Sequence, residues 1–322
     1  MDLHNKTPYP ALLARFGADD DVMGAALVVR VTYDIAGGRL FPSAEQAWPV
    51  APAPWECEYG PMEPDSAFYK GGVDLFVFGS ACAPYRRAVT HMRVVFEVGR
   101  FRRELAIFGN RAWLPRGTTV VMSAPQPFVT MPLTMENAYG GAGKWDGLEV
   151  TCPDNPKGKG FNLDLMQAVG KQLPNIEDPQ RLIRRWDDRP TPVGVRVCPM
   201  AFSTRLQRGA EFTDKGALKK LHGRLFNAAF PEMVIDDVRA GDPVRLTGVT
   251  PDVPVSFVIP EPPVMFRASY DAVTKEAVPG YDQIGVEVEK TRVFITYRYS
   301  FRYVLYARQK RKAELVMRQG KG

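Results

Sequence analysis

Histidines, cysteines and adjacent carboxylates are the residues of this 322-residue chain whose types could carry chemistry. The three histidines, His4, His91 and His222, do not stand at the His-Glu-x-x-His spacing that binds zinc. The four cysteines are scattered and form no Cys-x-x-Cys pair, which in so long a chain indicates reduced, partly buried thiols. We therefore expect neither a metal centre nor a bound cofactor.

Carboxylates occur in adjacent pairs at positions 187–188 and 236–237. Neighbouring side chains on a strand point to opposite faces, whereas acid–base pairs need carboxyl groups about 5–9 Å apart across a cleft. Solvated turns are therefore the favoured interpretation. Gly143 and Lys144 suggest a phosphate loop, but Trp145 stands where Ser or Thr is required and the first glycine is missing. The sequence also lacks a Gly-x-Ser-x-Gly elbow, so we expect no catalytic residues and no enzyme.

The most distinctive segment covers residues 125–141, PQPFVTMPLTMENAYGG. Its short apolar strand, residues 128–131, must end or lie at a sheet edge at Pro132, because proline has no backbone N–H. Glu136 precedes a glycine turn, where a carboxylate commonly accepts hydrogen bonds from backbone N–H groups. Gly140 and Gly141 predict positive φ angles or a close backbone approach. Loops held rigid in this way lower the entropic cost of docking another protein.

The composition predicts a globular, non-membrane protein. Hydrophobic residues make up 45% and aromatic residues 11% of the chain, enough for a sizeable core. Residues 301–322 hold seven Lys or Arg and one Glu, which accounts for the whole formal charge of +6. The basicity therefore belongs to the tail. No apolar run reaches the roughly 18 residues of a membrane helix, and the first residues lack a charged, then apolar, signal pattern. We expect a cytoplasmic protein that binds no membrane.

Alternating apolar residues predict most of the positioning elements. Helical spacing predicts one helix near residues 163–173, capped by Asn162, and a second over residues 215–226, and the basic segment 307–319 is helix-capable. The expected strands, with the hairpin turn at Gly99, cover residues 25–35, 73–78, 89–98, 101–108, 244–249, 255–259, 264–270, 284–288 and 293–303.

Strands clearly outnumber helices, so the predicted fold is mainly β, a two-sheet sandwich-like architecture with a loop-rich helical insertion and a basic C-terminal tail. We expect an N-terminal β region over residues 1–145, a loop and helix connection over 146–230, a C-terminal β region over 231–306 and a tail over 307–322. The two β regions belong either to one domain or to two.

The last predicted strand carries both aromatic and basic side chains, the residue types that bind nucleic acid. Single-strand binders place aromatic and basic side chains on the same face. Here the aromatic residues lie on one face and Arg298 and Arg302 on the other, which favours an aromatic core side and a wet side. The aromatic residues are Tyr297, Tyr299, Phe301 and Tyr303.

Residues 132–141 resemble the Pro-Leu-x-x-Glu-x-Ala-aromatic-Gly-Gly signature of a bacterial family of formally unknown function, which accompanies type VI secretion effectors and PAAR-like spike proteins. Other matching blocks follow in family order and extend the resemblance over about residues 65–300. Two departures stand out: Asn137 replaces the usual arginine, and Tyr139 a common phenylalanine. The other blocks lie at residues 70–84, 104–115, 155–160, 173–177, 188–194 and 226–229.

The resemblance implies a non-enzymatic adaptor or chaperone that binds a type VI secretion effector or a PAAR-like spike-tip protein, and in one version the spike itself. Two alternatives remain: a cell-wall or carbohydrate hydrolase that uses Glu136 with Asp187 or Asp188, and a nucleic-acid-binding module that uses the basic tail. Nucleic acid is not the expected partner. The expected partner-binding residues are Phe128, Pro132, Leu133, Glu136, Asn137, Tyr139, Gly140, Gly141, Asn155, Asp188, Arg189 and Pro190.

Overall fold

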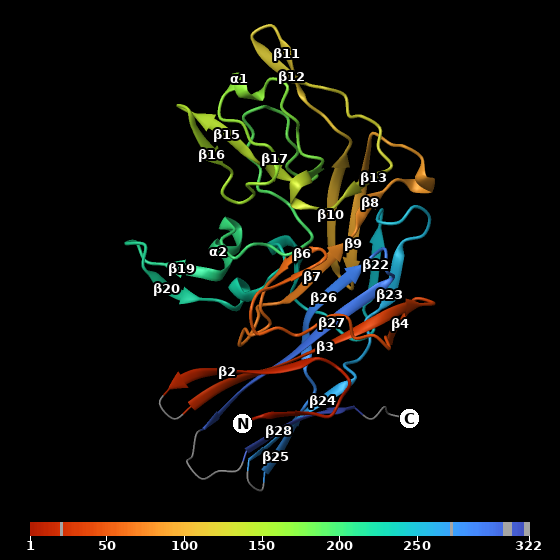
Figure 1. The fold of residues 1–322 in the computed structure, drawn as a ribbon, viewed down its shortest axis with the longest axis vertical. Helices are drawn as coiled ribbons and strands as arrows, with labels where there is room; N and C mark the ends of the chain where they lie inside the picture. The colour runs from red at the N-terminus through yellow and green to blue at the C-terminus, as the bar shows by residue number, and fades with distance from the viewer. Residues whose placement is uncertain (20–21, 271–272, 305–310, 319–322) are drawn as a thin grey trace.

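The computed structural model describes residues 1–19, 22–270, 273–304 and 311–318. Within these residues the chain is mainly β, with several sheets and few helices, as the sequence predicts (Figure 1). The described strands form three larger sheets of seven, five and four strands, together with several two-stranded ribbons. The domain boundaries given above stay a prediction.

The seven-stranded sheet joins strands from both ends of the chain. Its order is β2-β3-β27-β26-β7-β21, and β4 pairs with β3 beside this path. β3 and β27, the predicted strands 25–35 and 293–303, pair antiparallel along thirteen residues, while β7 and β26 run parallel. The bounds are β2 Ala11–Asp19, β3 Val22–Ala36, β4 Arg39–Pro42, β7 Val73–Phe78, β21 Val234–Ile235, β26 Gly280–Glu287 and β27 Arg292–Val304.

This sheet is buried on both faces along its central strands, which corrects one expectation. The sequence pattern predicts that Arg298 lies on the solvent side of its strand, but the residue is only 8% exposed. Arg30, on the opposite face of β3 from Val29 and Val31, is 1% exposed. Other parts of the chain cover the second face of the sheet. The charged residues on that face form buried ion pairs, so the alternation of apolar and polar residues in the sequence wrongly predicts that the face is exposed to water.

The five-stranded sheet contains the predicted hairpin, β9 and β10, in the order β18-β10-β9-β22-β23. Along β9, Val94, Phe96 and Val98 are buried while the residues between them are partly exposed or exposed, so this sheet has one covered face. The bounds are β9 His91–Val98, β10 Phe101–Phe108, β18 Ile176–Glu177, β22 Pro243–Thr247 and β23 Val255–Val258.

The four-stranded sheet, of order β1-β28-β24-β25, corrects the helical expectation for the tail. Residues 311–317 form strand β28, whereas residues 307–310 and 319 lie outside the described residues. Ala313 and Leu315 are fully buried at a spacing of two, so tertiary pairing overrides the helix propensity of this segment. The bounds are β1 Leu3–Asn5, β24 Val264–Tyr270, β25 Val273–Ala277 and β28 Arg311–Met317.

The predicted helices are largely wrong. The first shrinks to α1, Leu165–Ala168, and its cap is Asp164 rather than Asn162, because Asp164 accepts a 2.9 Å hydrogen bond from the backbone N of Gln167. In place of the second, β19 and β20 form a hairpin whose turn includes Gly216 at φ +77°, a conformation that ends a helix. A 3-10 turn, η3, follows, and the other helix, α2, precedes the hairpin. The bounds are α2 Ser203–Gly209, β19 Ala210–Phe212, β20 Leu218–Leu221 and η3 Gly223–Phe226.

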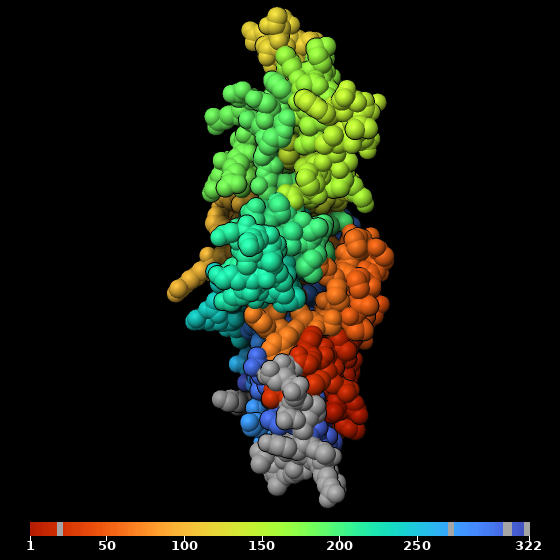
Figure 2. Space-filling view, turned by 90° about the vertical axis from the view of Figure 1, so that its left-hand side faces the viewer, coloured from red at the N-terminus to blue at the C-terminus, as the bar shows by residue number. Residues whose placement is uncertain are grey.

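Short ribbons and 3-10 turns build the upper part of the molecule in Figure 1, around a second, smaller hydrophobic cluster that contains Trp113, Tyr139 and Phe161. Figure 2 shows the yellow-green and green residues of this part above the teal β19–β20 region and the red N-terminal strands. The remaining elements are β5 Trp55–Cys57, β6 Gly60–Met62, β8 Ser80–Cys82, η1 Pro84–Arg86, β11 Trp113–Arg116, β12 Thr119–Met122, β13 Thr130–Pro132, η2 Met135–Asn137, β14 Tyr139–Gly140, β15 Ala142–Trp145, β16 Leu148–Thr151, β17 Lys159–Gly160 and η4 Pro231–Met233.

Candidate functional site

The signature segment folds as a short edge strand followed by a tight turn. β13 ends at Pro132, as predicted, and pairs only with β8 among the described strands. The strand begins at Thr130, later than expected, and Phe128 instead forms an isolated bridge with Val89. The 3-10 turn η2 then carries Glu136 to the surface and delivers the chain to β14.

The glycine pair confirms the expected close approach. Gly140 has φ +149° and Gly141 has φ +99°. A Cβ added to Gly140 would overlap the carbonyl oxygen of Asn155 and lie 2.8 Å from its Cβ. At Gly141 the added carbon would lie 2.6 Å from the carbonyl oxygen of Gly158. Only glycine fits here, because the neighbouring turn packs directly on this backbone.

Asn155 and Lys159 fasten the turn from the other side. The Nδ2 of Asn155, which is 3% exposed, donates to the carbonyl oxygens of Met135 at 2.8 Å and Tyr139 at 2.9 Å. The Nζ of Lys159 donates to the Oδ1 of Asn137 at 2.9 Å and to that of Asn175 at 2.8 Å. Burial lowers the pKa of Lys159. Asn137, where the resemblance expects arginine, thus holds the turn as an acceptor.

Several expected contact residues are buried parts of this scaffold. Phe128 is 9% exposed, Leu133 2% and Tyr139 4%, and burial raises the pKa of Tyr139 to about 12. These buried side chains support the exposed loop and do not form its surface. Glu136 and Pro132 are the exposed members of the signature.

The second block of expected residues stabilises its own loop. The Oδ2 of Asp188 accepts hydrogen bonds from the backbone N of Arg184 at 2.7 Å and of Arg185 at 2.8 Å. The guanidinium of Arg189 lies 5.7 Å from the ring centroid of Phe161, and the adjacent Pro190 is half-buried. Asp188 therefore caps a turn, as the solvated-turn interpretation expects.

A groove of about 370 Å³ lies beside the signature turn and brings Glu136 and Asn155 together. We call it the motif groove. This volume is within the usual range for ligand sites, about 300–1,000 Å³. Its walls are η2, the turn after Cys152, strand β6 and the segment before α2. The lining residues are Tyr59, Gly60, Pro61, Met62, Phe78, Thr134, Met135, Glu136, Asp154, Asn155, Pro156, Lys157, Arg196, Val197 and Pro199.

The two carboxylates of the motif groove have partners within the protein. A hydrogen bond with the Thr134 side chain lowers the pKa of Glu136 despite partial burial, and its own backbone N–H, Lys157 and Arg196 add to this effect. Asp154 accepts from the backbone N of Ser203 at 2.7 Å and from its Oγ at 2.6 Å. Both carboxylates therefore accept hydrogen bonds within the protein.

The two cations of the motif groove retain unused donors. Arg196 donates from Nη1 to the Tyr59 carbonyl oxygen at 3.0 Å, and its Nε is buried without an acceptor among the described residues. Burial lowers the pKa of Arg196. Lys157 is exposed and forms no ion pair with any residue that the structure describes. Sequence reasoning missed Arg196, which carries no signal beyond its place near the 188–194 block.

The hydrolase and nucleic-acid residues lie elsewhere. Asp187 pairs with the exposed Arg185 at 2.8 Å, and neither Asp187 nor Asp188 lines the motif groove. In the tail, Lys312 pairs with Glu314 at 2.8 Å and Arg318 with Glu261 at 2.6 Å, whereas Arg308, Lys310 and Lys321 lie outside the described residues. His222, expected on a helix, precedes η3 and bonds to Glu211 at 2.8 Å.

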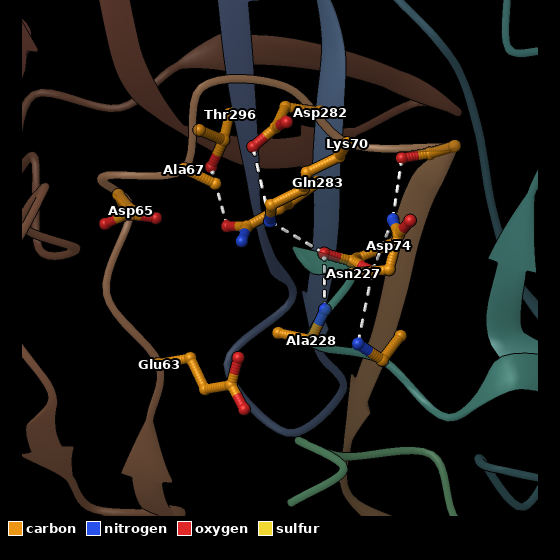
Figure 3. A network of polar contacts seen from close by, with 12 residues as sticks. Glu63, Asp65, Ala67, Lys70, Asp74, Asn227, Ala228, Asp282, Gln283 and Thr296 are labelled. Carbon is orange, nitrogen blue, oxygen red and sulfur yellow. Dashed lines mark hydrogen bonds and ion pairs between the residues drawn. The ribbon is translucent and has the colours of Figure 1, made fainter. Parts of the chain in front are cut away.

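A second polar cluster, around Lys70, lies at the central strands of the seven-stranded sheet (Figure 3). Lys70 lies between two carboxylates: its Nζ is 2.8 Å from Asp74 and 3.5 Å from Asp282. Asp74 also accepts from the Nδ2 of Asn227 at 3.0 Å, and Asp282 from the Nε of Arg298 at 2.7 Å. Although burial alone would raise it, Arg298 and Lys70 hold the pKa of Asp282 at about 2. One indication of this cluster is present in the sequence: Lys70 and Asp74 lie four residues apart beside and within an apolar strand.

The described residues contain neither a candidate metal-binding cluster nor a candidate membrane-spanning helix. No group of three or more His, Cys, Asp or Glu side chains could hold a metal ion. No described helix is long and apolar enough to cross a membrane.

Fold and site together define a mainly β protein with a preformed groove beside a Pro- and Gly-shaped turn. The chain belongs to the family described as "uncharacterized protein conserved in bacteria (DUF2169)", whose model matches residues 20–298. No curated protein and no solved structure matches it. The resemblance to a bacterial family of formally unknown function is thereby confirmed.

Proposed function

We propose that this protein is a non-enzymatic adaptor or chaperone that acts in the cytoplasm of the producing cell. It binds a type VI secretion effector or a PAAR-like protein and helps to load it onto the secretion spike. The identity of the partner rests on the sequence resemblance. The motif groove is the observation that supports a binding role.

Preorganisation is the physical argument for this role. The Asn155 side chain connects Met135 at the start of η2 with Tyr139 at the start of β14, and the Gly140 backbone packs against it. A surface fixed in this way loses little conformational entropy when a partner docks, so more of the contact energy appears as affinity. The groove walls also carry Met, Tyr and Arg side chains, which are enriched at protein interfaces.

Co-purification tests the proposal. The tagged full-length chain, expressed at its natural level in its own bacterium, is expected to bring down one stoichiometric partner that carries a toxin or PAAR-like domain. Deleting the gene is expected to reduce secretion of that partner. A chain that purifies alone, with secretion unchanged after deletion, would refute the proposal.

Replacing Glu136 by Gln separates this function from hydrolysis. An adaptor keeps its partner after the substitution, since the Glu136 carboxylate is already bonded within the protein. A hydrolase that depends on Glu136 loses cell-wall or carbohydrate cleavage while its fold and its partner binding persist. Cleavage of such a polymer by the wild-type chain, abolished by Glu136→Gln, would replace the adaptor proposal.

A further inference from the structure

We propose that the motif groove binds an extended acidic and apolar segment of the partner polypeptide. An Asp or Glu side chain of that segment pairs with Lys157 and Arg196, and a nearby apolar side chain packs on Met62, Met135 and Val197. The inference rests on the proposed function in one respect: the segment belongs to the protein that is loaded.

The charge argument depends on which groups are already satisfied. Glu136 and Asp154 already accept hydrogen bonds within the protein, from Thr134 and from Ser203. Lys157 has no ion-pair partner among the described residues, and Arg196 has one hydrogen-bonded nitrogen, Nη1, and lies 5.7 Å from the ring centroid of Tyr59. Lys157 and Arg196 can therefore still donate to a ligand, and a carboxylate is the acceptor that binds guanidinium and ammonium groups most strongly.

The apolar wall argues for a polypeptide rather than a free anion. Met62 is 4% exposed and Phe78 2%, and Met135 and Val197 are partly buried against the main core. Methionine side chains adapt to different apolar shapes, which suits recognition of a segment by character more than by a fixed sequence. A polypeptide segment can place a carboxylate and an apolar group side by side, as the two walls require.

Glu136 provides a test that distinguishes this specific binding from nonspecific binding to an apolar surface. Lys157 and Arg196 both lower the pKa of Glu136, so an acidic side chain bound to them lies within reach of the Glu136 charge. That repulsion weakens binding. Replacing Glu136 by Gln is therefore expected to tighten binding of acidic segments by roughly two- to fivefold, given the modest strength of charge interactions in partly exposed sites.

Selection from a random heptapeptide display library on the full-length chain tests the inference. Enriched peptides are expected to share an Asp or Glu close to an apolar residue. Lys157→Glu and Arg196→Gln are expected to weaken binding of a selected, labelled peptide by about tenfold or more, since each removes a charge contact in the groove. Lys157 is exposed, so its variant keeps the fold.

Arg116→Glu is the matched control. Arg116 is an exposed arginine on the β11–β12 hairpin, at the far end of the molecule in Figure 1, and its variant is expected to bind within twofold of wild type. Enrichment of peptides without an acidic residue, no enrichment at all, or equal binding by Lys157→Glu would overturn the inference. Preferred binding of a single-stranded oligonucleotide at the same residues would also overturn it.

The two proposals fail separately. If the wild-type chain and Lys157→Glu capture the same PAAR-like or toxin-bearing partner equally well, the groove inference is wrong and the adaptor function stands. If acidic peptides bind through Lys157 but the chain captures no such partner and secretion is unchanged without it, the adaptor function is wrong.

Discussion

Replacing Gly140 by alanine is expected to destabilise the protein by roughly 2–6 kcal/mol, from two separate costs. Its φ of +149° lies in a region that L-residues avoid, which costs about 1–3 kcal/mol. The new methyl group overlaps Asn155, and overpacking of this kind costs about 1–3 kcal/mol more. Asn155 cannot retreat without breaking its two hydrogen bonds to Met135 and Tyr139.

Equilibrium unfolding in urea, followed by tryptophan fluorescence, measures this loss. Gly147 is the matched control, because it has φ +78° with no atom near an added Cβ, so Gly147→Ala is expected to cost only about 1–2 kcal/mol. The surviving folded fraction of Gly140→Ala is also expected to bind selected peptides more weakly. A Gly140→Ala variant as stable as Gly147→Ala would show that the Asn155 turn yields freely, and the preorganisation argument would then fail.

Three further predictions concern burial and charge. Asp74→Ala is expected to lower the free energy of unfolding in urea by about 3–5 kcal/mol, because it leaves the buried Lys70 short of a partner, whereas the exposed Asp252→Ala changes it by less than about 0.5 kcal/mol. Because the pKa of Asp282 is lowered in the folded protein, its carboxylate stabilises the fold at pH values above the pKa it has in the unfolded chain, and this contribution is lost as the pH falls through about 2. The free energy of unfolding of the wild type is therefore expected to exceed that of Asp282→Asn by roughly 2 kcal/mol at neutral pH, and this difference is expected to shrink between about pH 4 and pH 2. A difference that does not vary with pH contradicts this. Burial raises the pKa of Cys198 and of the half-buried Cys57, so a thiol-specific reagent is expected to label at most Cys57 quickly in the native protein and all four cysteines in urea; rapid labelling of two or more native thiols rules this out.

Strands could be predicted because their signal is local. Strand β9 and the long strand β27 alternate apolar and polar residues over most of their length, and a repeat of two residues fits a strand and not a helix. The helices could not be predicted correctly. The spacing of Leu218 and Leu221 is compatible both with a helix and with a short hairpin. A glycine turn at Gly216 and tertiary pairing decided that segment.

The candidate site was predictable only where the backbone itself is unusual. Gly140, Gly141 and the end of a strand at Pro132 follow from steric rules that hold in any fold. Lys157 and Arg196 carry no such local signature, and only the fold brings them to one groove. A single sequence without relatives contains no information on which distant residues meet.

A comparison of the motif groove with the buried cluster around Lys70 favours the motif groove as the binding site. A second cavity, of about 430 Å³, is lined by Lys70, Asp282 and Arg298, and it is somewhat larger than the motif groove. Its charges pair with one another at 2.7–3.5 Å, so an incoming ion there would have to displace a buried partner at a cost of several kcal/mol. The cations of the motif groove displace nothing when a carboxylate arrives. Unsatisfied donors on a fixed scaffold, more than cavity size, therefore support the proposal that a partner binds in the motif groove.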